Sequence, residues 1–191
     1  MLSEQAFMDA ANELGVEVAT IKAVAEVESS GSGFLPSGEP KILFEPHIFW
    51  KELRKRNINP KDYLPFNEDI LYPVWGTRPY GKVSEQHGRL QKAVRINNEA
   101  ALRSASWGKF QIMGFNHVQC GFNLLQSFIN AMYKDEDSHL LAFTNYIIAT
   151  HLDDELREKD WAGFARGYNG ASYHKNKYDT KLALAYAKFS Q

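Results

Sequence analysis

The chain of 191 residues contains one cysteine and has no excess of charge of either sign. A single cysteine excludes an internal disulfide and a cysteine-based zinc site, and we expect Cys120 to be a buried thiol. The formal net charge is −1, and the 22 basic side chains are scattered among the 23 acidic ones. Because nucleic acids and anionic membranes both bind to basic faces, the sequence argues against a nucleic-acid partner and against stable membrane association.

Long apolar runs and targeting segments are missing as well. No stretch approaches the roughly twenty apolar residues that cross a membrane, and the first residues lack the basic and apolar regions of a signal peptide. We therefore expect a protein that stays in the compartment where it is made. Hydrophobic content of 44% and charged content of 24% are typical of a globular protein. The length, without repeats or linkers, predicts one domain over residues 1–191.

Helical periodicity dominates the sequence. We predict helices at residues 4–14, 18–30, 47–56, 84–97, 98–104, 123–134, 136–150, 153–167 and 177–189. The short apolar run at residues 41–44 follows a proline and predicts a strand or an extended segment. The stretch at residues 57–81 contains four prolines and is long for a loop, so we expect a functional segment or a packed surface lobe. Together these elements predict a mainly α-helical fold with at most a small β element.

The helix predicted at residues 18–30 carries two glutamates on different faces. At about 100° per residue, Glu28 lies within about 20° of Ile21 on the apolar face. Glu26 lies about 140° away, where we expect it to form a solvated pair with Lys22, four residues earlier. A carboxyl group on an apolar face, at the negative end of a helix dipole, is favoured in its protonated form. Glu28 therefore suits a general acid for a glycosidic oxygen, and the alternative is a buried structural glutamate with an arginine or backbone partner.

A glycine-bracketed stretch at residues 104–114 carries side chains that suit a carbohydrate site. Gln111 can contact a sugar hydroxyl or amide. Trp107 and Phe110 can stack on sugar faces, although aromatic residues next to glycine are also typical of packing in a core turn.

Residues 165–170 supply a third set of polar groups. Tyr168 offers an apolar ring with a hydroxyl, and Asn169 offers both amide functions. The same pattern fits the end of a helix, with Asn169 or Gly170 in the left-handed conformation, and that reading does not exclude a function.

The order of these segments resembles a known signature. Glu28-Ser29, Gly108-Lys-Phe-Gln111 and Tyr168-Asn169-Gly170 follow one another as in goose-type lysozymes and soluble lytic transglycosylases. More closely, residues 21–31, 41–47 and 104–114 resemble the N-acetylmuramidase domain of tailed-phage endolysins, and the resemblance runs from about Leu14 to the C-terminus.

This resemblance implies a lysozyme-like α+β fold and a peptidoglycan hydrolase. It would cleave the β-1,4 bond between N-acetylmuramic acid and N-acetylglucosamine, with Glu28 as catalytic acid and with neither a cofactor nor a metal. The candidate substrate-binding residues are Ser29, His47, Trp107, Gly108, Gln111, Tyr168 and Asn169. One departure from the pattern is Arg166-Gly167 in place of the usual residues before Tyr168, with Ala165 displaced upstream.

The resemblance also implies a setting for the protein. Its partner would be the glycan strands of bacterial peptidoglycan. It would remain in the host cytoplasm until a holin-like membrane-permeabilising protein releases it to the periplasm. We expect a monomer without a separate wall-binding domain. Two alternatives stay open: a lytic transglycosylase that forms 1,6-anhydro-muramic products, and a non-catalytic glycan-binding module.

Glu45 is the candidate for a second carboxylate. Retaining glycosidases place two carboxyl groups about 5–5.5 Å apart, and inverting ones about 6.5–9.5 Å apart. Glu45 follows the predicted strand at residues 41–44, where it can face Glu28 across a cleft. The alternative is a structural pair between Glu45 and His47. Metal binding by these two residues is not expected, because no further ligand cluster accompanies them.

Overall fold

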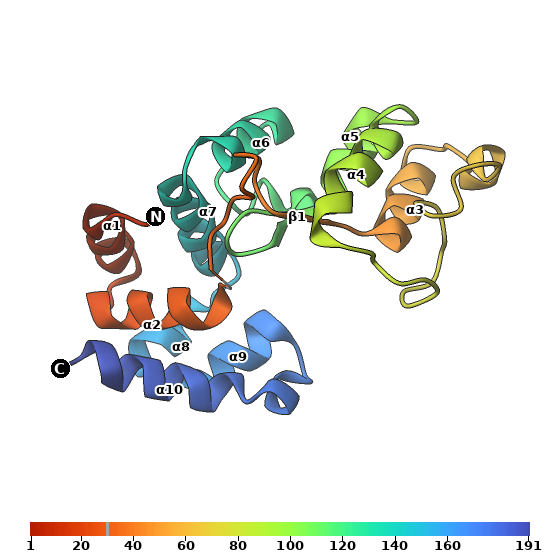
Figure 1. Cartoon of the computed structure of the whole chain (residues 1–191). Helices are drawn as coiled ribbons and strands as arrows, with labels where there is room; N and C mark the ends of the chain where they lie inside the picture. The colour runs from red at the N-terminus through yellow and green to blue at the C-terminus, as the bar shows by residue number, and fades with distance from the viewer. Residues whose placement is uncertain (30) are drawn as a thin grey trace.

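A computed structural model describes residues 1–29 and 31–191 and shows a mainly helical protein (Figure 1). The α-helices are α1 (Glu4–Leu14), α2 (Val18–Glu28), α3 (Pro46–Lys55), α4 (Gln86–Val94), α5 (Asn98–Arg103), α6 (Leu125–Lys134), α7 (Glu136–Ala149), α8 (Asp153–Glu158), α9 (Trp161–Asn169) and α10 (Tyr178–Phe189). Short 3-10 helices are η1 (Pro60–Tyr63), η2 (Val83–Glu85), η3 (Gly114–Asn116) and η4 (Tyr173–Asn176). Among the described residues, none of these helices is both long and apolar enough to cross a membrane.

Three short strands form one antiparallel sheet in the order β1-β2-β3. The strand predicted at residues 41–44 is confirmed as β1 (Ile42–Phe44), which pairs with β2 (Ala105–Trp107). The sequence did not predict β2 or its hairpin partner β3 (Ile112–Met113). The residues between them turn the chain tightly, with φ of 70° at Gly108 and 52° at Gln111. The predicted small β element is confirmed.

Several predicted helices differ at their ends from the structure, among them residues 84–97, of which α4 covers only Gln86–Val94, and two differences have a clear local cause. The helix predicted to reach Ser30 ends at Glu28, because Ser29 is extended, and Ser30 lies outside the described residues. The helix predicted at residues 153–167 is wrong as one element. It breaks at Lys159, which is left-handed, and the Asp160 side chain accepts a hydrogen bond from the Gly163 amide to start α9. A local cap therefore overrides the continuous helical pattern.

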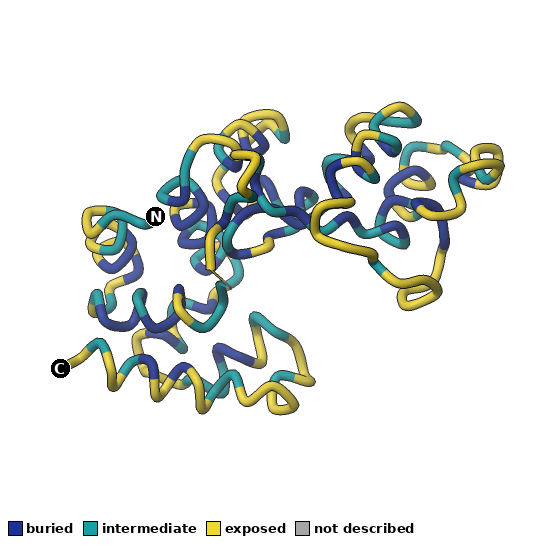
Figure 2. The backbone as a smooth tube through the Cα atoms, in the orientation of Figure 1, coloured by how far each residue is buried: buried dark blue, intermediate teal, exposed yellow. Residues whose placement is uncertain are grey.

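The sheet lies between two groups of helices (Figure 1). Helices α3, α4 and α5 lie on one side of β1, and α1, α2 and α7–α10 lie on the other. Inward-facing segments of both groups are buried, whereas the loop between η1 and η2 is mostly exposed (Figure 2). The largest fully buried side chains are Trp107, Phe44, Phe49, Phe128, Phe143 and Phe164. The prediction of a buried thiol is confirmed, since Cys120 is fully buried, and this burial raises its pKa to about 12.

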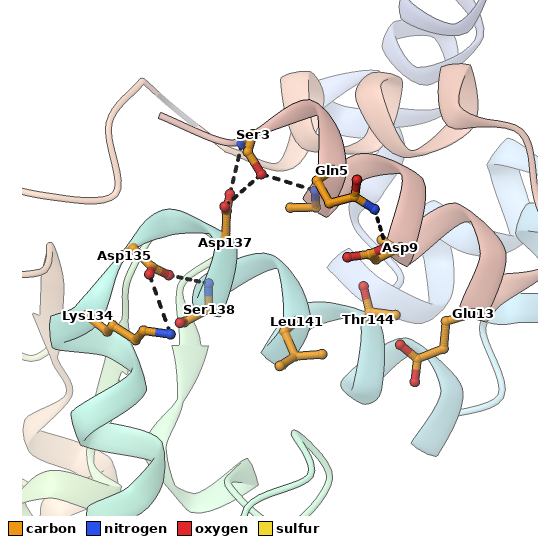
Figure 3. Close-up of a pocket in the computed structure, with 12 residues that line it drawn as sticks. Ser3, Gln5, Asp9, Glu13, Lys134, Asp135, Asp137, Ser138, Leu141 and Thr144 are labelled. Atoms are coloured by element: carbon orange, nitrogen blue, oxygen red, sulfur yellow. Dashed lines mark hydrogen bonds and ion pairs between the residues drawn. The ribbon is translucent and has the colours of Figure 1, made fainter.

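The N-terminal helix is attached to α7 by Ser3 (Figure 3). The Ser3 hydroxyl accepts from the Ala6 amide, which caps α1, and donates to Asp137 Oδ2 at 2.7 Å. The Ser3 amide donates to Asp137 Oδ1 at 2.9 Å. The hollow beside this contact, drawn in Figure 3, is lined by residues of the α1 and α6–α7 segments and by none of the motif residues.

Candidate active site

Glu28 is the last residue of α2 and lines a polar cavity. Val24 and Ala25, one turn earlier, are buried, so the helix brings Glu28 to the edge of the core. The other residues that line the cavity are Phe110, Gln111, Ile112, Met113, Asn116, Tyr146, Tyr168, Asn169 and Tyr178. Burial raises the pKa of Glu28 to about 7, while the Asn169 amide and the charge on Lys181 act in the opposite direction. The carboxyl group is therefore partly protonated near neutral pH.

Glu26 is exposed, as its helical face predicts, but its partner differs from the prediction. Its carboxylate pairs with Lys188 on α10, with Oε2 2.6 Å from Nζ. Lys22 pairs instead with Glu4 on α1 at 2.8 Å. The expected Lys22–Glu26 pair is wrong because helices that pack beside α2 offer both residues another partner.

Helix α9 delivers Tyr168 and Asn169 to the cavity. The Asn169 side-chain amide donates to Glu28 Oε1 at 2.8 Å, which joins residues 141 positions apart. The Tyr168 hydroxyl donates to the Phe110 carbonyl at 3.1 Å, and its ring packs against Phe143 and Phe164. Burial raises the pKa of Tyr168 well above its ordinary value. Tyr168 thus ties α9 to the β2–β3 turn, and Asn169 contacts the acid directly.

The end of α9 also explains the departure from the family pattern. Gly170 follows Asn169 with a φ of 82°, so the predicted helix end and the contact with Glu28 coexist. Arg166 and Gly167 are exposed, away from the cavity. A side chain at Gly167 would collide with Leu152, so glycine lets α9 approach that residue closely.

Gln111 lies in the β2–β3 turn, where its side chain lines the cavity. Its Oε1 accepts from the Ser106 hydroxyl at 2.9 Å. Its Nε2 donates to the Gly108 carbonyl at 2.8 Å and to the Lys41 carbonyl at 3.3 Å. The Gln111 side-chain amide therefore connects the turn to the segment before β1. The residue is nevertheless exposed and lines the cavity.

The two aromatic residues expected to stack on sugars are packed in the core. Trp107 is 1% exposed and its Nε1 donates to the Leu102 carbonyl at 3.1 Å. Phe110 is 3% exposed and stacks on Phe143 with ring centroids 4.4 Å apart. The expectation that they present a face to a sugar is wrong, because the hairpin turns both rings inward.

Gly108 and Ser29 have local roles in the structure. The left-handed Gly108 lies so close to His139 that a Cβ atom would stand 2.8 Å from Nδ1. The Ser29 hydroxyl donates back to the Ala25 carbonyl at the end of α2. Ser29 lines a separate hollow, next to Glu26, rather than the Glu28 cavity.

His139 was missed by the sequence reasoning, although it supports the turn. Its Nδ1 accepts from the Lys109 amide at 3.0 Å, and its Nε2 donates to the Met132 carbonyl at 2.8 Å. Burial lowers the pKa of His139, which favours this neutral form. A lone histidine within a helix has no local signal for such a role. Tyr146 and Tyr178, which also line the cavity, were missed for the same reason.

The structure does not bring Glu45 into the Glu28 cavity. Glu45 precedes α3, whereas Glu28 ends α2 on the other side of β1 (Figure 1). The Glu45 carboxylate accepts a short hydrogen bond from the Tyr80 hydroxyl, and His47 Nδ1 lies 3.3 Å from its Oε2. Burial lowers the pKa of His47 against the pull of the Glu45 charge. Among the described residues, no group of three or more His, Cys, Asp or Glu side chains is arranged to hold a metal.

These features define a mainly helical, lysozyme-like α+β fold with one glutamate held in a polar cavity. A family model described as Muramidase, N-acetylmuramidase, matches residues 17–190, so the chain belongs to the N-acetylmuramidase family. The chain is similar to the solved structure "Crystal structure of Burkholderia AP3 phage endolysin", with 37% identity and a TM-score of 0.90. The match covers 99% of this chain and 71% of that one. A comparison with curated proteins gives no significant match. The resemblance noted in the sequence is confirmed.

Proposed function

We propose that the protein is an endolysin-type peptidoglycan hydrolase that cleaves the β-1,4 bond between N-acetylmuramic acid and N-acetylglucosamine. The observation that carries the proposal is the Glu28 carboxyl group, which lines a cavity, has a pKa of about 7 and accepts a hydrogen bond from Asn169. General acids work best when their pKa lies near the working pH, because the group is then largely protonated and still acidic enough to transfer its proton. Membership of the N-acetylmuramidase family supports the same substrate.

The contact with Asn169 suggests how Glu28 acts. Because the amide donates to Oε1, the proton of neutral Glu28 resides on Oε2. That proton passes to the glycosidic oxygen as the bond to the muramic anomeric carbon breaks, and Glu28 becomes a carboxylate. The Asn169 amide and the charge on Lys181 both stabilise that carboxylate. The same groups that lower the pKa in the free protein therefore favour the product of proton transfer.

After the glycosidic bond has broken, two different nucleophiles are candidates for attack on the anomeric carbon. Glu28 is the single carboxylate among the described residues that line the cavity, and Glu45 does not join it. Glu28 would then act as base after acting as acid. If it takes a proton from water while the water oxygen bonds to the anomeric carbon, the product is a reducing muramic acid. If it takes the proton from the 6-hydroxyl of the same sugar, that oxygen closes a 1,6-anhydro ring, which is the transglycosylase product. The family supports hydrolysis, whereas a cavity lining in which Glu28 is the one carboxylate among the described residues is also compatible with the transglycosylase.

Mass spectrometry of digested peptidoglycan separates the candidates. Hydrolysis by a muramidase predicts new reducing muramic acid ends. Anhydro-muramic ends would support the transglycosylase, and reducing glucosamine ends would contradict both. If the protein bound peptidoglycan but released no soluble fragment, the result would support a non-catalytic glycan-binding module.

The cellular setting is part of the proposal. We infer that the protein acts as a monomer, as a single catalytic domain, and that it reaches peptidoglycan from the cytoplasm after a holin-like protein opens the membrane. Light scattering during gel filtration tests the monomer. Expression in a Gram-negative host tests the release step. Lysis should follow addition of chloroform or co-expression of a holin, and lysis on expression of the protein alone would contradict it.

A further inference from the structure

Three hollows share lining residues and run from Glu28 to the exposed loop between η1 and η2. Gln111 lines the Glu28 cavity and also the next one, which is lined by the edge of β1 and by Gly81. Gly81 in turn lines a third hollow together with Arg78, Pro79 and Tyr80. Because each shared residue belongs to two hollows, the three are neighbours along one surface. The three hollows therefore follow one another from Glu28 toward Arg78.

The far end of this path is formed by residues 78–83, which are exposed yet firmly anchored. Ile70 and Leu71, in the middle of the loop, are buried in the core, whereas residues 73–79 are exposed (Figure 2). The segment at residues 78–83 is held by hydrogen bonds. Tyr80 is its anchor. The hydroxyl of Tyr80 donates to Glu45, and its carbonyl accepts from Gln86 Nε2 at 2.7 Å and from Arg89. Gln86 is 1% exposed and its Oε1 accepts from the Phe44 amide at 3.1 Å, which ties the loop to β1.

These contacts give Glu45 a structural role, which is to hold Tyr80 in position. The Glu45 carboxylate accepts a hydrogen bond from the Tyr80 hydroxyl. Trp75, whose indole lowers the pKa of that hydroxyl, remains 69% exposed. A wall fixed before a ligand arrives loses less conformational entropy on binding than a mobile loop does. The exposed indole of Trp75 offers an aromatic face next to this wall, a surface on which sugars stack.

The charges around the third hollow leave one cation available. Asp69 pairs with Lys92 at 2.5 Å, and Glu85 accepts from the Lys82 amide at 2.9 Å. Arg89 donates to the carbonyls of Tyr80 and Asp69. Within the part of the chain that the structure describes, Arg78 has no hydrogen bond or ion pair, and it lines the hollow. A guanidinium group with free donors is suited to bind a carboxylate in a bidentate manner.

From this arrangement we propose that the glycan groove extends from Glu28 past Gln111 and Gly81 to Arg78, and that Arg78 binds a carboxylate of the peptide attached to muramic acid. The proposal rests on the proposed function, since peptidoglycan is the glycan that carries acidic peptides. It assigns to residues 78–83 the recognition of peptide-bearing strands. Tyr80 and Glu45 are positioning residues for this wall.

The test compares the affinity for two strands in the Glu28→Gln background, where turnover does not consume the ligand. One strand is soluble peptidoglycan with its peptides, and the other is the same preparation after an amidase has removed them. The inactivated parent should bind the peptide-bearing strand more tightly. Adding Arg78→Ala should reduce the ratio of the two affinities by about two- to fivefold, because Arg78 is exposed and an exposed ion pair contributes up to about 1 kcal/mol. Arg78→Lys in place of Arg78→Ala should retain part of the affinity ratio. High salt should reduce the affinity ratio of the inactivated parent.

Arg95→Ala is the matched control, because Arg95 is exposed at the end of α4 and lines none of the three hollows. The Arg78 site would be overturned if the Arg78→Ala variant had the same affinity ratio as the inactivated parent. An equal loss for both strands would also overturn it, because the bound group would then not be the peptide carboxylate. If the wild-type protein still cleaves peptidoglycan in either case, the proposed function stands. A protein that neither binds nor cleaves either strand would overturn both proposals.

Discussion

Replacing Asn169 by alanine should move the basic limb of the pH–activity profile to higher pH. The Asn169 amide donates to Glu28 Oε1 at 2.8 Å and lowers a pKa that burial raises to about 7. A hydrogen bond to a charged group contributes about 1.5–3 kcal/mol, and about 1.4 kcal/mol corresponds to one pKa unit. Water that enters the cavity replaces part of this contribution, so we expect the Glu28 pKa to rise by about one unit.

The sign of this effect follows from the role of Glu28. A general acid must be protonated, so activity is lost as pH rises through its pKa, and a higher pKa moves that loss upward. Turnover at the optimum should fall about tenfold, because the carboxylate formed by proton transfer loses its donor.

The assay is kcat/KM on purified peptidoglycan between pH 5 and 10, with Asn116→Ala as the control. Asn116 lines the same cavity but does not hydrogen-bond to Glu28 in the structure. A basic limb that stays in place, or that moves to lower pH, in Asn169→Ala would refute this account of the acid.

Three further changes test other parts of the account. Glu28→Gln should raise the free energy of unfolding by about 1–3 kcal/mol at pH 8 and leave it nearly unchanged at pH 4; chemical denaturation at both pH values measures this. The folded-state pKa lies above the ordinary value of 4.5, so the wild-type protein loses stability as pH rises from about 4.5 through about 7. Gln111→Ala should loosen the β2–β3 turn and lower both turnover and the melting temperature, and a fall in turnover alone would indicate a direct contact with sugar. Glu45→Gln should lower stability by about 1–3 kcal/mol and leave turnover on peptide-free strands close to wild type, whereas a strong loss of turnover at unchanged stability would restore it as a second catalytic carboxylate.

Local periodicity located most of the helices and the face of Glu28, but it missed the break at Lys159 between α8 and α9. The residues that follow each other along a helix determine which side chains face the core, so Glu28 and Glu26 were separated from the sequence alone. The ion pairs were not predictable in the same way. Lys22 and Glu26 are well spaced to pair, but Glu4 on α1 and Lys188 on α10 compete for them only after the helices pack.

The set of residues that line the cavity could not be predicted from any single segment of the sequence. Asn169 and Glu28 lie 141 positions apart, and only the resemblance to a known motif order brought them together in advance. Glu45 does not line the Glu28 cavity, and its hydrogen bond from Tyr80, 35 positions along the chain, had no local signal in the sequence. Trp107 was misassigned because an aromatic residue next to glycine fits a core and a sugar site equally well.

The central claim is that Glu28 is the catalytic acid of this cavity, and a pair of variants tests it most directly. The measurement is the rate of soluble muropeptide release from peptidoglycan by Glu28→Gln and Glu26→Gln, each checked for folding by circular dichroism. Glu28→Gln should lose at least about a hundredfold in rate, the lower range for removal of a general acid. Glu26→Gln should keep a rate close to wild type, because Glu26 is exposed and pairs with Lys188 outside the cavity. A folded Glu28→Gln variant that retains most of the wild-type rate, or a comparable loss in both variants, would contradict the claim.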